Sequence, residues 1–481
     1  MIDDLKPYPR MKDSGVPWLG EVPEQWEILP ALAAYKPKLV KNTGMVEKTV
    51  LSLSYGRIIV KPPEKLRGLV PESFETYQIV DTGNIIVRTT DLQNDHTSLR
   101  IGHSRNRGII TSAYLCLETT DRVSNEFGYQ FLNTYDLLKI IYGFGSGLRQ
   151  NLDFSDIKRM PVLVPPKKEQ STIVRFLDHA DRRIRSYILA KQKLIKLLEE
   201  QKQAIIHSAV TRGLDPNVRL KPSGLEWLGE VPEHWTLARL KDAAVVQTGL
   251  TLGKNYRGVK TESRPYLRVA NVQVGRVDLK NVKYLDVPSN EANGATLRSG
   301  DVLMTEGGDI DKLGRGCVWR DEIPGCLHQN HIFAVRCRKD VLSPEFLAGL
   351  MASQHGRAYF QLTAKQTTNL ASTNSTTLRA FPVFLPPLPE QQTILDEIAR
   401  KTAGLVVAMG RAEQEIEFLR EYRVRLIADV VTGKLDVREA AARLPDEGDE
   451  PEPLDDAEAL AEGEEETEDA DLDAVPEEAE V

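Results

Sequence analysis

Two long stretches of the chain place apolar residues at alternating spacings of four and three. They cover about residues 172–207 and a counterpart near 394–426. This heptad pattern is typical of helices that pack along a shared apolar seam, as in a coiled coil. We therefore predict two paired helices; the alternative is that each helix packs only against its own globular block. The predicted seam consists of Ile173, Leu177, Ile184, Leu194, Leu198, Ile205, Ile394, Ile398, Leu405, Leu419 and Leu426.

Each predicted helix begins in a segment that occurs twice. VPPKKEQSTI at 164–173 returns as LPPLPEQQTI at 385–394, an offset of 221 residues. The Pro-Pro pair ends the preceding extended chain and favours a helix start directly after it. If a pseudo-twofold axis relates the two copies, the helices must run antiparallel.

A nonapeptide is also repeated. WLGEVPEQW at 18–26 returns as WLGEVPEHW at 227–235, and the two copies contain four of the five tryptophans. Taken alone, the motif could be a stable capping turn used twice. Together with the helix repeat, it indicates two equivalent frames that hold two different inserts.

The two inserts, residues 27–165 and 236–387, show no evident similarity to each other. Strand-like runs such as NIIVR (84–88), PYLRVA (265–270) and HIFAVR (331–336) alternate with loops rich in Gly and Asn. This pattern predicts an α+β fold for both inserts.

Charge is distributed unevenly along the 481 residues. The net charge is −8, but residues 446–481 hold 19 acidic and no basic side chains. The remaining chain carries 62 basic against 51 acidic side chains, a net charge of +11. A basic body indicates a polyanionic partner such as nucleic acid. The acidic tail is expected to be disordered, either as a solubilising extension or in a regulatory role.

The N-terminal sequence and the cysteine count indicate the cellular compartment in which the protein is expected. The chain has no apolar N-terminal region typical of a secretory signal and no run near the ~20 apolar residues of a membrane helix. Four cysteines are too few and too scattered for a disulfide framework. We therefore expect a cytoplasmic protein.

No catalytic motif in the chain is complete. TGLTLGKN (248–255) lacks the glycine spacing and the hydroxyl residue of a phosphate-binding loop. GFGSG (143–147) suggests a methyltransferase glycine loop, but no acidic strand end precedes it and a turn is favoured. Cys317, Cys326, His328, His331 and Cys337 match no common zinc spacing, so no metal site is expected.

Taken together, these features resemble the specificity subunit of a type I restriction-modification enzyme. The resemblance rests on two variable blocks, each followed by PP-x-x-EQ-x-x-I and a long helix. It covers nearly everything from Gly15 to Asp436. Further matching segments are GLRQNL (147–152), TGLTLGK (248–254), LMTEGGDIDKLGRG (303–316), CLHQNHIFAVR (326–336) and TTNLASTN (367–374).

The resemblance implies an α+β architecture with two globular target-recognition domains, separated by two long helices that form an antiparallel coiled coil. Each domain would read one half of a split, asymmetric sequence in double-stranded DNA. The expected division is an N-terminal frame segment (1–26), a first domain (27–165), a first helix segment (166–215), a repeat linker (216–235), a second domain (236–387), a second helix segment (388–436) and an acidic tail (437–481).

The resemblance also implies that the chain makes and breaks no bonds itself and binds no cofactor. Two modification subunits would methylate adenine with S-adenosylmethionine, and restriction subunits would cleave DNA with ATP and Mg²⁺. Two alternatives stay open: a scaffold that binds only proteins, and a nuclease that acts alone, although no acidic metal cluster is evident for the latter.

Polar and basic side chains on Gly-rich backbone are the candidates for DNA contact, either to bases or to phosphates, since such backbone can approach a groove closely. The candidates are Arg88, Arg105, Arg149, Thr248, Lys254, Asn255, Thr305, Gly307, Gly308, Lys312 and Arg315.

Overall fold

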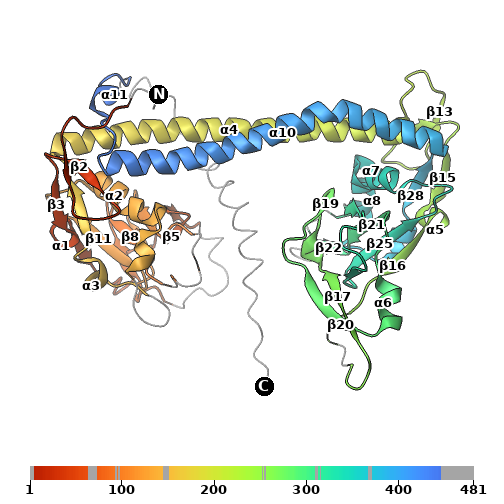
Figure 1. Ribbon diagram of the computed structural model, residues 1–481, viewed down its shortest axis with the longest axis horizontal. Coiled ribbons are helices and arrows are strands. Elements are labelled where there is room, and N and C mark those ends of the chain that lie inside the picture. Colours follow the sequence, from red (N-terminus) through yellow and green to blue (C-terminus); the bar gives the residue numbers. More distant parts are fainter. Residues whose placement is uncertain are drawn as a thin grey trace. The chain divides into compact units, whose positions relative to one another are not determined.

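The chain forms two compact units, and each contains part of both long helices (Figure 1). Unit 1 comprises residues 1–191 and 414–481, and unit 2 comprises residues 192–413. The computed structural model describes residues 5–445 except 63–72, 91, 93–94, 96–97, 145–150, 252, 254–255, 309–312, 315 and 367–370. The acidic tail from residue 446 onward therefore lies outside the described residues. No helix in the described part of the chain is long and apolar enough to cross a membrane.

The two long helices are α4, Lys167–Arg212, and α10, Leu388–Val431. They contain 46 and 44 residues, so α4 is longer than the predicted 172–207 at both ends. The reason at its start is the Pro-Pro pair: Glu169 and Gln170 already donate backbone hydrogen bonds to the Pro166 carbonyl. At the other end, a glycine with positive φ follows each helix and stops it: Gly213 (+72°) after α4 and Gly433 (+76°) shortly after α10.

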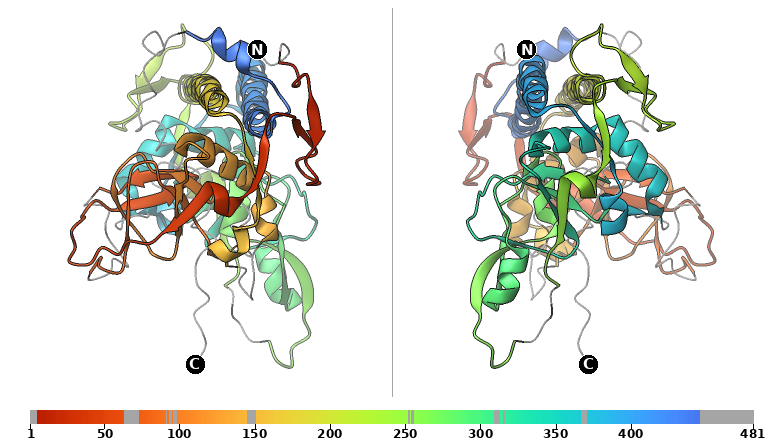
Figure 2. Two further views of the ribbon diagram at one scale, coloured as in Figure 1. Left: turned by 90° about the vertical axis from the view of Figure 1, so that its left-hand side faces the viewer. Right: turned by 90° about the vertical axis from the view of Figure 1, so that its right-hand side faces the viewer.

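Within unit 1 the helices run antiparallel. Asp181 of α4 pairs with Arg423 of α10, and further along α4 the Lys191 ammonium lies 2.5 Å from the Glu415 carboxylate. Residue numbers therefore rise along one helix as they fall along the other. Figure 2 shows the two helices side by side. The predicted α+β architecture with a paired-helix element is confirmed.

The predicted seam residues differ in burial. Those buried are Ile173, Leu177, Ile184, Ile394 and Leu426, and those half-buried are Leu198, Ile205, Ile398, Leu405 and Leu419. Leu194 departs from the predicted seam, because its side chain is 41% exposed. A straight helix drifts by about 20° per heptad relative to a 3.5-residue repeat, so a strict heptad assignment turns outward along a long helix.

Unit 1 holds the first insert, whose main sheet has the strand order β4-β11-β8-β9. The pairs β1–β2, β3–β12, β5–β6 and β7–β10 form smaller antiparallel sheets. The elements are β1 Met11–Asp13, β2 Glu21–Pro23, β3 Glu27–Pro30, α1 Ala31–Ala34, β4 Tyr35–Lys38, β5 Leu51–Ser54, β6 Arg57–Val60, β7 Gln78–Val80, β8 Ile85–Val87, β9 Ile101–His103, β10 Gly108–Ile110, β11 Leu115–Thr119, α2 Asn125–Leu137, η2 Ile140–Gly143, α3 Phe154–Ile157, β12 Pro161–Val164 and α11 Arg438–Ala442.

Unit 2 holds the second insert, whose main sheet has the order β16-β25-β21-β23, beside a three-stranded sheet β20-β17-β24. The elements are β13 Leu220–Pro222, β14 Glu230–Pro232, β15 Thr236–Arg239, α5 Leu240–Ala243, β16 Ala244–Thr248, β17 Glu262–Leu267, η3 Val269–Asn271, β18 Val272–Gln273, β19 Arg276–Val277, β20 Lys283–Val287, α6 Ser289–Ala295, β21 Asp301–Thr305, β22 Gly307–Gly308, β23 Gly316–Val318, β24 Leu327–His328, β25 Ile332–Cys337, α7 Pro344–Ala352, α8 Gln354–Thr363, β26 Lys365–Gln366, β27 Ala371–Ser372, α9 Ser375–Arg379 and β28 Pro382–Leu385.

The two inserts share one topology although their sequences show no evident similarity. In each main sheet the strands, numbered by their order along the chain, are arranged 1-4-2-3, with all neighbours antiparallel. In each unit a helix follows the fourth strand, and a further strand pair, β3–β12 or β15–β28, closes the insert beneath its long helix. The repeated frame is thus matched by a repeated sheet.

The repeated nonapeptide joins the insert to the start of a long helix. Trp26 is fully buried and its indole N–H donates to Glu169 Oε1 of α4 at 3.0 Å. In unit 2, Trp235 donates in the same way to Glu390 Oε1 of α10, also at 3.0 Å. The acidic residue of the EQ motif is therefore the partner of a motif tryptophan in both units.

The same tryptophans also cover the end of the other long helix. A Cβ atom placed on Gly433, just beyond α10, would lie 2.4 Å from Pro23 and 2.9 Å from Trp26. In unit 2, a Cβ on Gly213, just beyond α4, would lie 3.4 Å from Trp235. Each motif thus contacts one helix start and one helix end, which explains why the chain contains the motif twice.

The glutamine of the EQ motif fastens the helix start to the insert. Gln170 accepts the Ser124 backbone N–H at 2.8 Å, and Ser124 caps α2. Gln391 accepts the Ser343 backbone N–H at 2.8 Å, and Ser343 caps α7. Both amides also donate to the carbonyl of the first proline in the preceding Pro-Pro pair. The frame therefore positions each insert through matching buried polar contacts.

Candidate nucleic-acid interface

One edge of the main sheet in unit 2 gathers segments that lie far apart in the sequence. The register pairs Thr248 with Phe333, Thr305 with Ile332, and Met304 with Gly316. The ends of β16 and β21 and the starts of β25 and β23 therefore meet at the same edge. We call Thr248, Thr305, Glu306, Gly307, Gly308, Asn330 and His331 the sheet edge.

Backbone hydrogen bonds hold the sheet edge together. The Leu250 N–H donates to the His328 carbonyl, and the Glu306 N–H donates to the His331 carbonyl at 2.8 Å. β22 pairs with β27, and the Thr373 N–H donates to the Glu306 carbonyl at 2.8 Å. The described residues of the segments 248–254, 303–316, 326–336 and 367–374 therefore contribute to this edge or border it.

Close backbone approach explains one of the glycines in these segments. A Cβ atom on Gly249 would lie 2.0 Å from the His328 carbonyl oxygen. Any side chain there would push β16 away from the strand that leads into His331.

Four basic residues flank the sheet edge: Arg268, Arg276, Lys280 and Lys283. The turn before Arg276 lies beside the start of β23, because the Gly275 N–H donates to the Gly316 carbonyl at 3.0 Å. Arg268 adjoins Val269, whose N–H donates to the Gln329 side chain. Within the described part of the chain, none of the four forms an ion pair. The flanking cations are therefore available to an external anion.

A second connection ties Lys280 and Lys283 to this region. The Asn271 amide donates to the Asp278 carbonyl at 2.9 Å, which holds the segment before Lys280 against η3. Lys283 begins β20 and pairs with Tyr266 of β17, next to the strand end from which Arg268 follows. Sequence reasoning missed all four cations, although RVANVQVGRVDLKNVKY (268–284) has the basic and polar composition that would have indicated them.

Sequence-predicted contact residues of the second insert fall into two groups. The structure brings Thr248, Thr305, Gly307 and Gly308 to the sheet edge. The other predicted residues, Lys254, Asn255, Lys312 and Arg315, lie outside the described residues, as does Arg149 of the first insert.

The first insert uses its corresponding edge differently. Arg88 follows β8 at the position equivalent to the end of β21, but its guanidinium lies 3.2 Å from the Asp95 carboxylate. Arg100 is fully buried and donates to the Thr90 and Asp95 carbonyls at 2.7 and 2.6 Å. Its guanidinium also lies over the Tyr142 ring. Both arginines therefore stabilise the loop between β8 and β9.

Arg88 follows the end of β8, which pairs with the start of β9, whereas Arg105 follows the end of β9. The two arginines therefore lie at opposite edges of the same sheet. The structure therefore does not bring Arg88 and Arg105 together. The reason is that consecutive antiparallel strands place their two connecting ends on opposite edges of the sheet.

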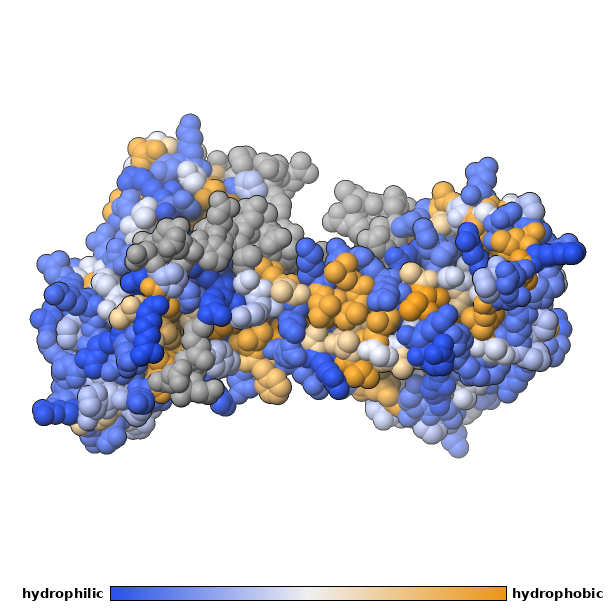
Figure 3. Space-filling view, turned by 90° about the horizontal axis from the view of Figure 1, so that it is seen from above, coloured by the Kyte–Doolittle hydropathy of each residue, from blue (hydrophilic) through white to orange (hydrophobic). Residues whose placement is uncertain are grey.

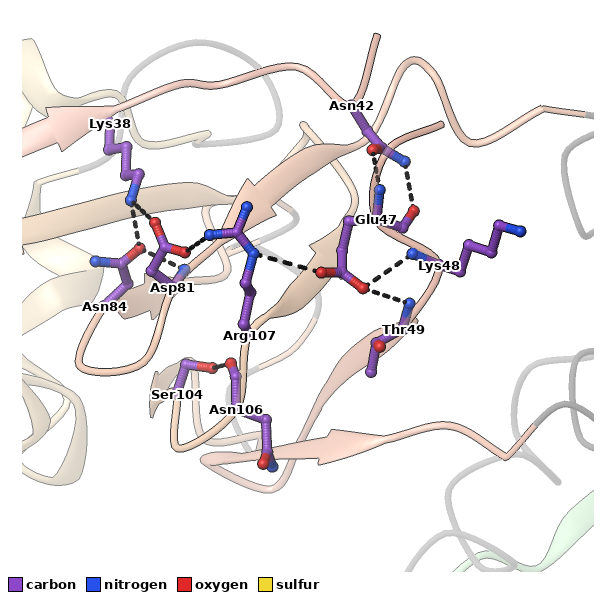
Figure 4. A network of polar contacts seen from close by, with 10 residues as sticks. All are labelled: Lys38, Asn42, Glu47, Lys48, Thr49, Asp81, Asn84, Ser104, Asn106 and Arg107. Atoms are coloured by element: carbon purple, nitrogen blue, oxygen red, sulfur yellow. Dashed lines mark hydrogen bonds and ion pairs between the residues drawn. The ribbon is translucent and has the colours of Figure 1, made fainter. Parts of the chain in front are cut away.

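A polar network stabilises the edge that carries Arg105 (Figure 4). Lys38 and Arg107 both bind Asp81, at 2.6 Å each, and Arg107 also reaches Glu47. Burial opposes the charge of Lys38, but its hydrogen bonds to Asp81 and Glu118 raise its pKa. The hydrogen bond from Lys38 lowers the pKa of Asp81. The basic groups of this network are thus occupied within the insert, unlike the flanking cations of unit 2.

The cysteines and histidines considered for zinc are separated by the fold. Cys317 and Cys326 belong to one apolar core cluster and Cys337 to another, and burial raises the pKa of each thiol to about 12. His328 is buried and bonded to the Ala295 carbonyl, whereas His331 is exposed at the sheet edge. Among the described residues no group of three or more potential ligands comes together.

The long helices expose apolar side chains away from the inserts (Figure 3). In unit 1 these include Tyr187 and Phe418, which is 69% exposed. In unit 2 they include Leu197, Val406 and Val407. Large exposed apolar side chains on neighbouring helix turns are typical of protein contact surfaces.

Comparison with known proteins agrees with this architecture. The family described as "Type I restriction modification DNA specificity domain" matches residues 64–198. The chain is similar to the putative type I restriction enzyme MjaX specificity subunit of Methanocaldococcus jannaschii, with 25% identity over 207 residues, 43% of this chain and 47% of that protein. It is also similar to the type I restriction enzyme EcoKI specificity subunit of Escherichia coli, with 24% identity over 266 residues, 54% of this chain and 53% of that protein.

The chain is similar to type I restriction enzyme specificity subunits. The resemblance inferred from the sequence is confirmed. The chain spans about half the length of these two curated relatives. The chain is also similar to a solved structure described as "Structural basis underlying complex assembly and conformational transition of the type I R-M system". The TM-score is 0.58 at 14% identity, and the match covers 86% of this chain and 99% of that one. At this identity, the likeness concerns the fold alone.

Proposed function

We propose that this chain is the sequence-reading subunit of a type I restriction-modification complex. Each insert recognises one half of a split, asymmetric site in double-stranded DNA. The chain directs adenine methylation and restriction that its partner subunits carry out. The observation that carries the proposal is the sheet edge of unit 2, with its flanking cations and its Gly-rich backbone.

The chemistry of this edge suits DNA. The four flanking cations have no acidic partner among the described residues, so phosphates can take that place. The sheet edge itself offers a hydroxyl, a carboxylate, an amide and an imidazole, which can bond to base edges. Phosphate contacts thus orient the duplex and polar edge groups read it.

The partner subunits dock, on this proposal, against the exposed apolar side chains of α4 and α10. Two modification subunits supply the methyl transfer with S-adenosylmethionine, and restriction subunits use ATP and Mg²⁺. The pseudo-twofold repeat supports a pair of modification subunits, because two equivalent frames offer two equivalent docking surfaces.

Duplex binding by the full-length chain at increasing salt tests the proposal. Affinity should fall steeply, with log K linear in log salt, because neutralised phosphates release counterions. A K280A/K283A double variant should reduce the slope by about 0.9 for each lysine that contacts a phosphate.

The matched control is K241A/K339A, which changes two exposed lysines of unit 2 that lie at the opposite edge of the same sheet. Its salt slope should equal that of the wild-type chain. A full-length chain without duplex affinity at any salt concentration would instead support the alternative, a scaffold that binds only proteins.

A further inference from the structure

Glu306 is the only acidic residue of the sheet edge. Its backbone is fixed on both sides, since its N–H donates to the His331 carbonyl and its carbonyl accepts the Thr373 N–H, both at 2.8 Å. Its Oε2 lies 2.7 Å from His331 Nδ1. The side chain nevertheless stays 32% exposed. The carboxylate is therefore held in one place and faces solvent at the edge.

The imidazole of His331 orients this carboxylate. If Nδ1–H donates to Glu306, Nε2 is left as an acceptor, and the Asn330 amide nitrogen lies 3.3 Å from it. This arrangement gives both ring nitrogens of His331 a hydrogen-bond partner. Within the described residues, Oε1 of Glu306 receives no hydrogen bond, so one carboxylate oxygen is open to a ligand.

A surface that only neutralises phosphates would not be expected to carry a carboxylate. None of the described ion pairs joins Glu306 to a flanking cation, so it does not serve to offset their charge. Next to a DNA backbone it would be repelled by the phosphates. Its presence is accounted for if it meets a hydrogen-bond donor on the DNA.

Base amino groups are such donors. In the major groove, cytosine presents its N4 amino group and adenine its N6 amino group, whereas guanine and thymine present acceptor oxygens at the corresponding places. An acceptor-only group such as a carboxylate therefore favours cytosine or adenine.

We propose that Glu306, positioned by His331, reads the amino group of a cytosine or adenine at one position of the half-site recognised by unit 2. This inference rests on the proposed function. It assigns Glu306 to base reading and the flanking cations to phosphate contact. Loss of Glu306 should therefore change the sequence preference, whereas loss of a flanking cation should weaken binding to all sequences.

Selection of a random duplex library by the full-length chain tests the inference. The wild-type chain should enrich a motif with cytosine or adenine at the position that Glu306 reads, and the enriched base distinguishes the two. E306Q, which keeps the size but removes the charge, should lower that preference by roughly 10- to 100-fold, as expected for a lost hydrogen bond to a charged group. Preferences at the other positions should persist.

The same variant should not weaken binding to DNA that lacks the motif, because removing a carboxylate removes a repulsion from phosphates. A folding defect would instead reduce binding to all sequences together. The matched control is E262Q, at the far end of β17, where Glu262 is paired with Arg264 at 3.2 Å; its motif should equal that of the wild-type chain.

An E306Q chain with the wild-type preference at every position would overturn the inference, and so would a uniform loss of affinity. In both cases salt-dependent binding by the wild-type chain would leave the proposed function standing. A wild-type chain that binds no duplex would overturn both.

Discussion

The two inserts differ at their surfaces far more than in their sheets. Both arrange four strands as 1-4-2-3 and both attach to a long helix through a Trp–Glu bond and a Gln bridge. At corresponding edges, however, Arg88 and Arg100 of the first insert are bound within a loop, whereas Arg276 and Lys283 of the second have no described ion-pair partner. This fold therefore tolerates different edge chemistry on one scaffold.

The scaffold tolerates such change because a sheet requires little of its sequence. Strands need apolar residues on the buried face and main-chain pairing, and many sequences provide both. The edge loops contribute little to that core, so their side chains can change without loss of the sheet. The frame contacts cannot change so freely, since each buries a polar group that needs its partner.

Exchange of one insert should change the recognised DNA sequence more than any other substitution. Replacing residues 236–387 by the insert of another specificity subunit should change one whole half of the recognised sequence. The other half should persist, because the first insert keeps its own frame contacts. Mapping of methylated adenines in cells that carry the complete system measures this result. A chimera in which both halves changed would show that the inserts do not read independently.

Truncation of the buried motif tryptophans tests whether the two frames are equivalent. W26A and W235A should each lower the free energy of unfolding by about 3–5 kcal/mol, because each leaves a cavity and removes the indole hydrogen bond to a glutamate. Hydrogen exchange should locate the loss in unit 1 for W26A and in unit 2 for W235A.

The matched controls for these variants are L32A and L237A, whose exposed side chains lie just beyond each motif. Both should be close to neutral in thermal unfolding. A much smaller effect of one tryptophan variant would mean that the two frames do not share one role.

A smaller and pH-dependent difference concerns the residue beneath the first motif tryptophan. In unit 1, Tyr135 packs edge-on against Trp18 and donates to the Pro161 carbonyl at 2.7 Å. In unit 2, His355 occupies the equivalent place, stacked on Trp227 and bonded to the Pro382 carbonyl at 2.9 Å. Burial lowers the pKa of His355 to about 4.

The unfolded chain binds a proton at this histidine below its ordinary pKa of about 6.5, while the folded chain does not until about pH 4. Stability is therefore fully present above pH 6.5 and is lost as pH falls toward 4, by an amount on the order of 3 kcal/mol. Unit 2 should lose protection from hydrogen exchange over this range more than unit 1. H355Q, which keeps a donor and an acceptor but does not titrate, should reduce the difference, and an unchanged pH profile would contradict a contribution from His355.

Features that depend on local pattern could be predicted from the sequence alone. Heptad spacing and the Pro-Pro pairs located both long helices, and the repeated WLGEVPE motif identified two frames around two inserts. Strand-like runs at 84–88 and 331–336 correspond to β8 and β25. The charge count separated a basic body from an acidic tail, and the motif pattern indicated the resemblance to type I specificity subunits.

Which side chains meet depends on the tertiary structure. Trp26 and Glu169 are 143 residues apart, and Glu306 and His331 are 25 residues apart, so no spacing in the sequence connects either pair. The same holds for the arginines. The sequence does not distinguish Arg88 from Arg276. In the structure Arg88 is paired with Asp95, whereas Arg276 forms no ion pair with a described residue. Periodicity in the sequence indicates which face of a helix or strand is buried. Whether a charged side chain is paired depends instead on residues far away in the sequence that the fold brings next to it.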